Sequence, residues 1–218
     1  MPGRVESLAT KPLLRGVSHQ VAAFAALFGW AAIVAAAPTS AARTAAHVYA
    51  ASLFALFAVS ATYHTPTWSP VARAWMRRLD HAAIFMLIAG TYTPLCLLLG
   101  GRRGMGLLLV VWIGAVGGAV QSVLWVRAPK ALAAAIYVVL GWVVLPVLPA
   151  MRAAVGTWGL ALLAVGGISY TIGAVVYSAR APNPWPRVFG YHEVFHALVI
   201  VAAACHFAVA FAAVRGIR

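Results

Sequence analysis

Acidic side chains are nearly missing from this sequence, which has three of them against sixteen lysines and arginines. Charged residues of all kinds make up 9% of the chain and hydrophobic residues 64%. Soluble domains have about 25% charged and about half apolar residues. This composition therefore excludes an ordinary soluble domain and indicates a membrane protein.

Cysteine is also scarce, because only Cys96 and Cys205 occur and both fall inside apolar stretches. We expect free packing thiols, which say nothing about the redox compartment. The basic residues form no block interleaved with aromatic side chains of the kind that binds nucleic acid. Despite the net charge of +13, we therefore expect no nucleic-acid partner.

Long apolar runs, in contrast, are abundant. About 20 apolar residues, at 1.5 Å per residue, cross about 30 Å of hydrocarbon. Seven runs meet this length, near residues 18–37, 45–64, 81–99, 105–126, 131–150, 157–178 and 191–213. The short connections hold nearly all Arg, Lys and Pro. The sequence thus predicts an all-α membrane protein, with one seven-helix transmembrane domain over residues 1–218 and no second domain.

The charges in the loops predict the orientation, because lysine and arginine accumulate on the cytoplasmic side. With the N-terminus inside, the inside segments carry ten of these residues and the outside segments carry six. We therefore predict a cytoplasmic N-terminus and an external C-terminus. A cleaved signal peptide ending at Ala35-Ala36-Ala37 is the alternative for the first run. The long polar leader and Pro38 disfavour cleavage.

Polar residues converge at the ends of three runs. Ser60 and His64 end the second run, Asp80 opens the third, and His192 and His196 begin the seventh. Four crossings separate the loop after the second run from the start of the seventh, so the chain returns to the same membrane face. Ionisable groups at membrane depth cost about 2.5–3.5 kcal/mol each on insertion scales, and they mark a functional site.

The spacing of these histidines suits a metal ion. His192 and His196 are four apart and face the same side of a helix, and His64 offers a third imidazole. Three neutral imidazoles with an open fourth position are the ligands of a catalytic zinc, which lowers the pKa of its bound water to about 7. Asp80, expected at a helix N-terminus, is placed to orient that water or take its proton. Ser60 is placed to hold a water or a substrate carbonyl.

The stretch 192–196, which reads HEVFH, also matches the H-E-x-x-H pattern of metalloproteases, in which the glutamate is the general base. An intramembrane protease would be expected to supply a further metal-binding aspartate on a later helix, and no acid follows Glu193. His64 is therefore the better third ligand. The remaining histidines are expected to snorkel, pack or form hydrogen bonds in the bundle: His19, His47, His81 and His206.

Three separated motifs resemble the hemolysin III family, the bacterial branch of the progestin and adipoQ receptor (PAQR) superfamily, which is similar in turn to alkaline ceramidases. They are Ser60-x-x-x-His64, RRLDHAAIF over 77–85 continuing to AGTYTP over 89–94, and FGYHEVFH over 189–196. The resemblance covers essentially the whole chain. One departure is the stretch 65–68, TPTW, where many relatives have an asparagine-containing segment.

The resemblance implies a seven-helix protein of the bacterial plasma membrane with zinc near the cytoplasmic face. It implies His64, His192 and His196 as zinc ligands, Asp80 beside the metal-bound water and Ser60 in the same cluster. Three functions follow: a zinc-dependent hydrolase of a lipid amide or ester, a receptor-like or membrane-homeostasis module with structural zinc, and the cytolysin of the family name. We expect a membrane lipid as substrate or ligand, and a homo-oligomer is compatible with the sequence.

An open ligand position beside Asp80 favours the hydrolase, since structural zinc normally has four protein ligands. A permanently membrane-resident chain disfavours the cytolysin, because a toxin that inserts into foreign membranes has to be secreted.

Overall fold

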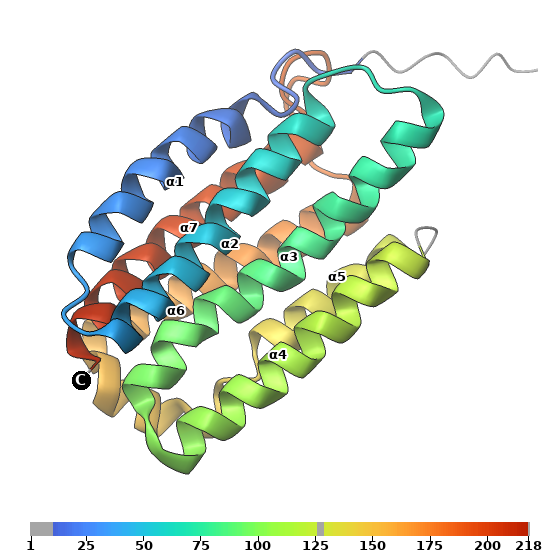
Figure 1. The fold of residues 1–218 in the computed structure, drawn as a ribbon. Helices are drawn as coiled ribbons and strands as arrows, with labels where there is room; N and C mark the ends of the chain where they lie inside the picture. The colour runs from blue at the N-terminus through green and yellow to red at the C-terminus, as the bar shows by residue number, and fades with distance from the viewer. Residues whose placement is uncertain (1–10, 126–128, 218) are drawn as a thin grey trace, which may run out of the picture.

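The computed structural model describes residues 11–125 and 129–217, and within them the chain is helical (Figure 1). The elements are α1 (Val17–Ala35), α2 (Ser40–His64), α3 (Pro70–Leu99), α4 (Gly101–Leu124), α5 (Lys130–Gly141), the 3-10 turn η1 (Leu145–Val147), α6 (Leu148–Ala179) and α7 (Tyr191–Gly216). Among the described residues, extended pairing is limited to one isolated bridge between Trp185 and Phe189. The predicted all-α class is confirmed.

In the described part of the chain, six helical stretches are long and apolar enough to cross a membrane. Five of them are α1, α2, α3, α4 and α7, and the sixth runs through α5, η1 and α6 as Ala131–Ala179. At 49 residues this last stretch would measure about 74 Å as a straight helix, more than twice the hydrocarbon thickness of about 30 Å. It therefore has to bend or turn back.

Gly156 breaks the helical geometry of this stretch, with φ 73° and ψ 175°, a conformation that favours glycine. The Trp142 indole Nε1 donates a hydrogen bond to Thr171 Oγ1 at 3.0 Å, and Gly156 lies midway along the chain between these two residues. This is the pairing of an antiparallel hairpin, and α5 contacts α6 along it (Figure 1). The predicted span 131–150 is not one helix, because α5 ends at Gly141.

Helix α3 begins at Pro70, well before residue 81, where the predicted span starts. The Ser69 hydroxyl accepts a hydrogen bond from Ala72 N at 3.3 Å, and proline suits the first turn. Asp80 therefore lies inside a helix of 30 residues, about 45 Å long. Its expected position at a helix N-terminus is wrong, and the helix dipole does not stabilise its charge.

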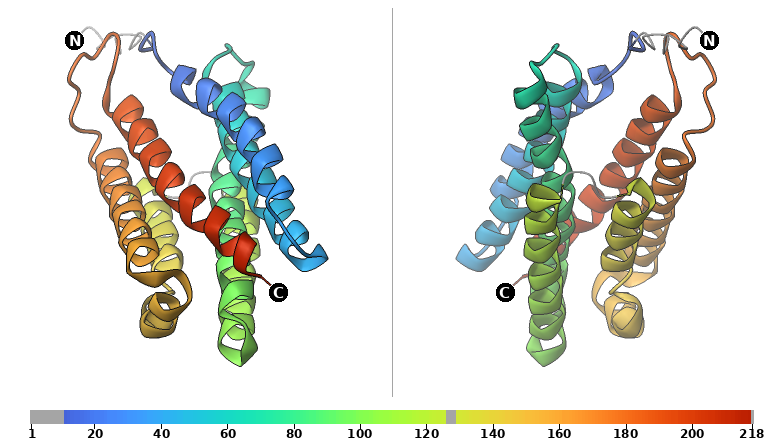
Figure 2. Two further views of the ribbon diagram at one scale, coloured as in Figure 1. Left: turned by 90° about the vertical axis from the view of Figure 1, so that its left-hand side faces the viewer. Right: turned by 90° about the vertical axis from the view of Figure 1, so that its right-hand side faces the viewer.

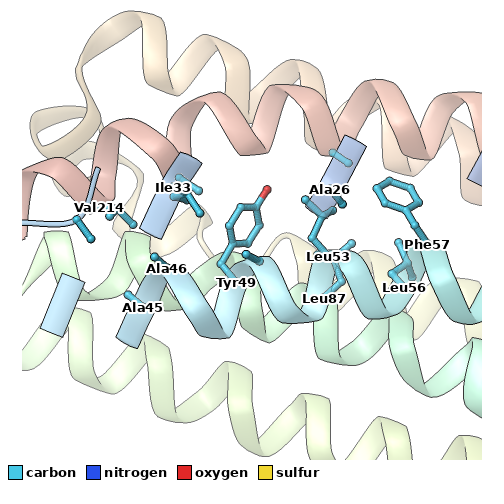
Figure 3. Packing of buried hydrophobic residues seen from close by; sticks show 14 of the residues in the cluster. Ala26, Ile33, Ala45, Ala46, Tyr49, Leu53, Leu56, Phe57, Leu87 and Val214 are labelled. Atoms are coloured by element: carbon cyan, nitrogen blue, oxygen red, sulfur yellow. The ribbon is translucent and has the colours of Figure 1, made fainter. Parts of the chain in front are cut away.

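Helix α2 forms the centre of the core, packed against α1, α3 and α7. Alanines such as Ala42, Ala45 and Ala46 are fully buried, and side chains this small allow close helix approach. Figure 3 shows Tyr49, Leu53, Leu56 and Phe57 of α2 beside Ala26 and Ile33 of α1, Leu87 of α3 and Val214 of α7. This packing fixes the end of α2 relative to α3 and α7.

The start of α1, the α2–α3 loop and the α6–α7 loop lie at one end of the bundle (Figures 1 and 2). Leu13 N donates to Arg187 O at 3.0 Å, and Lys11 Nζ donates to Thr65 O at 2.7 Å. These bonds join three segments that are far apart in sequence. Of the charges counted for orientation, Arg4, Arg127 and Arg218 lie outside the described residues.

Candidate metal centre

Three histidines from two helices face one another at this end. His64 is the last residue of α2, and His192 and His196 lie in the first two turns of α7. One ring nitrogen from each lies within 4.8 Å of the others, and the Nε2 atoms of His64 and His192 are 3.1 Å apart. Nitrogens bound to one zinc at 2.0–2.1 Å are about 3.3 Å apart in a tetrahedral site. Small side-chain rotations therefore suffice to hold an ion.

The three imidazoles are shielded from solvent, with exposed fractions of 10% for the His64 side chain, 8% for His192 and 1% for His196. His196 Nδ1 is buried and has no hydrogen-bond partner among the described residues. A buried polar atom left without a partner costs free energy. The chemistry of the donor set and this open nitrogen both fit a bound metal ion or an ordered water.

Asp80 and Ser60 form a polar pair next to the histidines. Asp80 Oδ2 lies 3.9 Å from His64 Nε2, and the Ser60 hydroxyl donates a hydrogen bond to the Asp80 carboxylate. The Asp80–His64 separation is too long for a direct hydrogen bond and leaves space for a bridging water. The structure thus brings together all five residues that the sequence singled out.

Glu193 has a different role from the one in the H-E-x-x-H pattern. The Arg15 guanidinium Nε donates to Glu193 Oε1, and Gly190 N donates to Oε2 at 2.8 Å. With both oxygens engaged and 2% exposure, this carboxylate caps the start of α7 and joins it to the segment before α1. A glutamate three residues after the helix-capping Gly190 is the sequence signal for this role.

His19 lies against the cluster, whereas the sequence predicted a side chain that snorkels or bonds a neighbour. Its ring is 2% exposed and stacks on His196 with centroids 3.7 Å apart and planes 3° apart. Its edge also contacts Phe57 at 5.0 Å between centroids. This contact holds the orientation of the His196 ring. No local signal identified it, because a histidine near the start of an apolar run is typical of an interfacial residue.

Two other histidines behave as predicted. His47 Nδ1 accepts a hydrogen bond from Trp30 Nε1 at 3.0 Å, and His206 Nδ1 lies 2.8 Å from Ala202 O inside the bundle. His81 lines the cavity that adjoins the cluster. None of the three belongs to the group of metal-competent side chains found among the described residues.

A cavity of about 850 Å³ opens beside the cluster and extends to His206, ten residues deeper along α7. Its lining includes the three clustered histidines, Ser60 and Asp80, and its deeper wall is largely apolar with a few hydroxyl groups. Pockets of about 300–1,000 Å³ with an apolar lining and a few convergent polar groups are typical ligand sites.

Positive charge gathers at the end of the cavity that holds the histidine cluster. Lys11, Arg15 and Arg73 all lie close enough to act electrostatically on His64. Partial burial, and then the Arg15 and Arg73 guanidinium groups, lower the pKa of Lys11. The clustering of like charges here is therefore a property of the fold, not only of the composition.

The family model described as Haemolysin-III related matches residues 8–207, which is nearly the whole chain. The chain belongs to this family. The Hemolysin-3 homolog of Bacillus subtilis (strain 168) is 32% identical over 161 residues, covering 73% of this chain and 72% of that protein. Hemolysin-3 of Bacillus cereus is 32% identical over 170 residues, with coverages of 78% and 74%.

The Heptahelical transmembrane protein ADIPOR2 of Oryza sativa subsp. japonica is 30% identical over 184 residues, covering 73% of this chain and 77% of that protein. The resemblance to the hemolysin III family, and through it to the PAQR superfamily, is therefore confirmed. Together with the apolar helices, these matches identify a multi-pass membrane protein.

Proposed function

We propose that this protein is a zinc-dependent hydrolase that cleaves an amide or ester bond of a membrane lipid. The observation that supports it best is a cluster of three buried imidazoles beside an aspartate–serine pair, at the end of a large cavity. Three nitrogen ligands leave a position for water or substrate, as in catalytic zinc sites.

Zinc held by His64, His192 and His196 would lower the pKa of a water to about 7 and polarise the scissile carbonyl. Asp80 would accept a proton from a water held beside His64, because its Oδ2 lies 3.9 Å from His64 Nε2. Ser60 fixes the direction of that carboxylate through its hydrogen bond. The apolar cavity wall accommodates acyl chains and excludes bulk water from the carbonyl.

The test combines metal content with turnover. Wild-type protein is expected to contain about one zinc per chain, and His192→Ala to lose most of it, while His47→Ala and His206→Ala keep it. Asp80→Asn is expected to keep zinc and lose turnover of a panel of ceramides, acyl amides and phospholipids by about 10²–10⁴-fold, because the amide cannot accept the proton. Zinc content unchanged in all three ligand variants, or zinc-loaded protein inactive on the whole panel, would refute the proposal.

We propose seven crossings, with Gly156 at the turn between the fifth and sixth and with the N-terminus in the cytoplasm of a bacterial cell. The loop charges support this orientation, which places the histidine cluster at the cytoplasmic end. In a cysteine-free background, a cysteine at Ser69 should react with an impermeant reagent only after permeabilisation, and one at Arg102 from outside. The reverse pattern would place the cluster outside.

A second function is favoured by one observation: the cluster joins α2 to α7. An ion there would fix the packing of these helices, and a lipid in the adjoining cavity would alter it, as in a receptor-like or homeostasis module with structural zinc. A cytolysin, the third candidate, is supported by the names of the Bacillus relatives alone.

A further inference from the structure

One stripe of α3 runs along the cavity from the end of the bundle that holds the histidine cluster toward its interior. Arg73, Arg77, Asp80, Ile84 and Ile88 all line the cavity, and their spacing of three or four residues places them on one helix face. Two guanidinium groups are therefore followed by the carboxylate beside His64 and then by apolar side chains. At 1.5 Å per residue, Arg77 lies about 4.5 Å and Arg73 about 10 Å from Asp80 along the helix axis.

Within residues 11–125 and 129–217, neither arginine of this stripe forms an ion pair with an acidic side chain. The ion pairs among the described residues join Arg15 to Glu193 and His64 to Asp80. The next arginine, Arg78, is differently engaged, since its Nε donates to Val123 O at 2.9 Å and its guanidinium lies over the Trp75 ring. Asp80 is the one acid among the described residues that line the cavity.

Guanidinium groups recognise phosphate with a planar fork of donors. Burying them against a neutral head group would leave donors unpaired, which costs free energy. Lys11 adds to the positive potential at this end of the cavity, since it acts on His64 together with Arg73, and such a potential concentrates anions.

We propose that the lipid taken by this cavity is a glycerophospholipid, with its phosphate on Arg73 and Arg77 and an acyl chain along the apolar wall. Phosphate and acyl ester stand on neighbouring glycerol carbons, a separation close to the rise of about 4.5 Å between Arg77 and Asp80. With the phosphate at Arg77, the ester carbonyl reaches the level of Asp80 and His64. A neutral ceramide or diacylglycerol lacks the group that the arginines bind.

This inference rests on the proposed function only in treating the bound lipid as a substrate. When the ester of this lipid is hydrolysed, the oxygen of a water molecule forms a bond to the acyl carbon. The bond from the acyl carbon to the glycerol oxygen breaks. The water proton passes to Asp80 and then to the departing glycerol oxygen. The products are a fatty acid and a lysophospholipid, and no oxidant or reductant is consumed.

Binding to zinc-free protein in neutral detergent tests the inference without turnover. The probes are phosphatidylglycerol, diacylglycerol with the same acyl chains, and inorganic phosphate. Wild type is expected to bind phosphatidylglycerol at least about 10-fold more tightly than diacylglycerol, because charged hydrogen bonds add to the acyl contacts. The double variant Arg73→Gln/Arg77→Gln is expected to lose that preference and keep its diacylglycerol affinity, which also shows that it folds.

The matched control is Arg102→Gln/Arg103→Gln, an identical change of charge in the first turn of α4, which should keep the preference. Arg77→Lys should retain part of it, because the charge remains and the planar fork is lost. Equal affinity for the two lipids in wild type, a preference that survives in the double variant, or phosphate binding as tightly as phosphatidylglycerol would overturn the inference. Failure of turnover with the preference intact would instead refute the hydrolase and leave a phospholipid site.

Discussion

Replacing Glu193 by glutamine tests whether this carboxylate is a structural cap of α7 bonded to Arg15 or the general base of an H-E-x-x-H site. In the structure this carboxylate joins Arg15 to the start of α7 and accepts from Gly190 N. Glutamine keeps one oxygen for Gly190 N but presents an NH₂ group, or a weaker neutral acceptor, to the Arg15 guanidinium. A hydrogen bond to a charged group is worth about 1.5–3 kcal/mol. Because the Arg15 side chain is 21% exposed, solvent screening reduces this, and we expect a loss of about 1–2 kcal/mol.

For a chain of this size, 1 kcal/mol corresponds to about 2–4 °C, so the unfolding midpoint should fall by about 2–8 °C. Zinc content and turnover per folded molecule should stay near wild type. The assay is thermal unfolding in detergent, followed by metal analysis and turnover at a temperature well below both midpoints. Arg43→Gln, at an exposed arginine of α2, is the control and should leave the midpoint unchanged.

A double-mutant cycle with Arg15→Met should give a coupling free energy of at least about 1 kcal/mol, because the stability effects of substitutions at two contacting residues do not add. The opposite result would refute our reasoning: an unchanged midpoint with turnover reduced by about 10²–10⁴-fold. Glu193 would then be a general base, as in the H-E-x-x-H proteases.

Two further changes test the surroundings of the site. Tyr92→Phe should destabilise the protein by about 1–3 kcal/mol, because its hydroxyl donates to Gly141 O at 2.7 Å and accepts from Val144 N at 3.2 Å. Tyr49→Phe is the control, since the buried Tyr49 hydroxyl has no partner among the described residues. Thermal unfolding measures both variants, and equal losses of stability would contradict the role given to the Tyr92 hydrogen bonds. His19→Ala should weaken zinc affinity by about 10-fold, as loss of groups that orient ligands does, and His19→Phe should restore most of it by keeping the stacked ring. Competition with a chelator measures both, and an unchanged affinity in His19→Ala would remove His19 from the site.

The convergence of His64, Asp80 and His192 was predictable, because hydropathy locates the apolar runs and counting crossings assigns each end to a membrane face. The start of α3 was predicted wrongly, because Arg73 and Arg77 made its first turns resemble a loop. Ser69 followed by Pro70 was the signal for that start, a capping hydroxyl before a first-turn proline.

The break after α5 had a sequence signal as well, namely Pro146 within the apolar run 131–150, because proline removes a helical hydrogen bond. The contact between His19 and His196 had none. It depends on how α1 packs against α7, and helix packing at this level is set by the whole bundle rather than by the residues around either histidine.

The interrupted region after Gly141 has a consequence for the biogenesis of the protein. Helix α5 has 12 residues, about 18 Å, which is less than a bilayer needs, and backbone groups freed by a break are costly in lipid unless other groups pair with them. Here the hydroxyl of Tyr92 in α3 pairs with the backbone groups of Gly141 and Val144. The neighbouring Trp142 indole donates a hydrogen bond to Thr171 of α6. Thr171 is synthesised after α5, so a nascent chain that ends before α6 lacks a partner this region needs. The backbone groups freed at the break can therefore pair with α3 before α6 is made, whereas the Trp142 indole gains its partner when α6 follows.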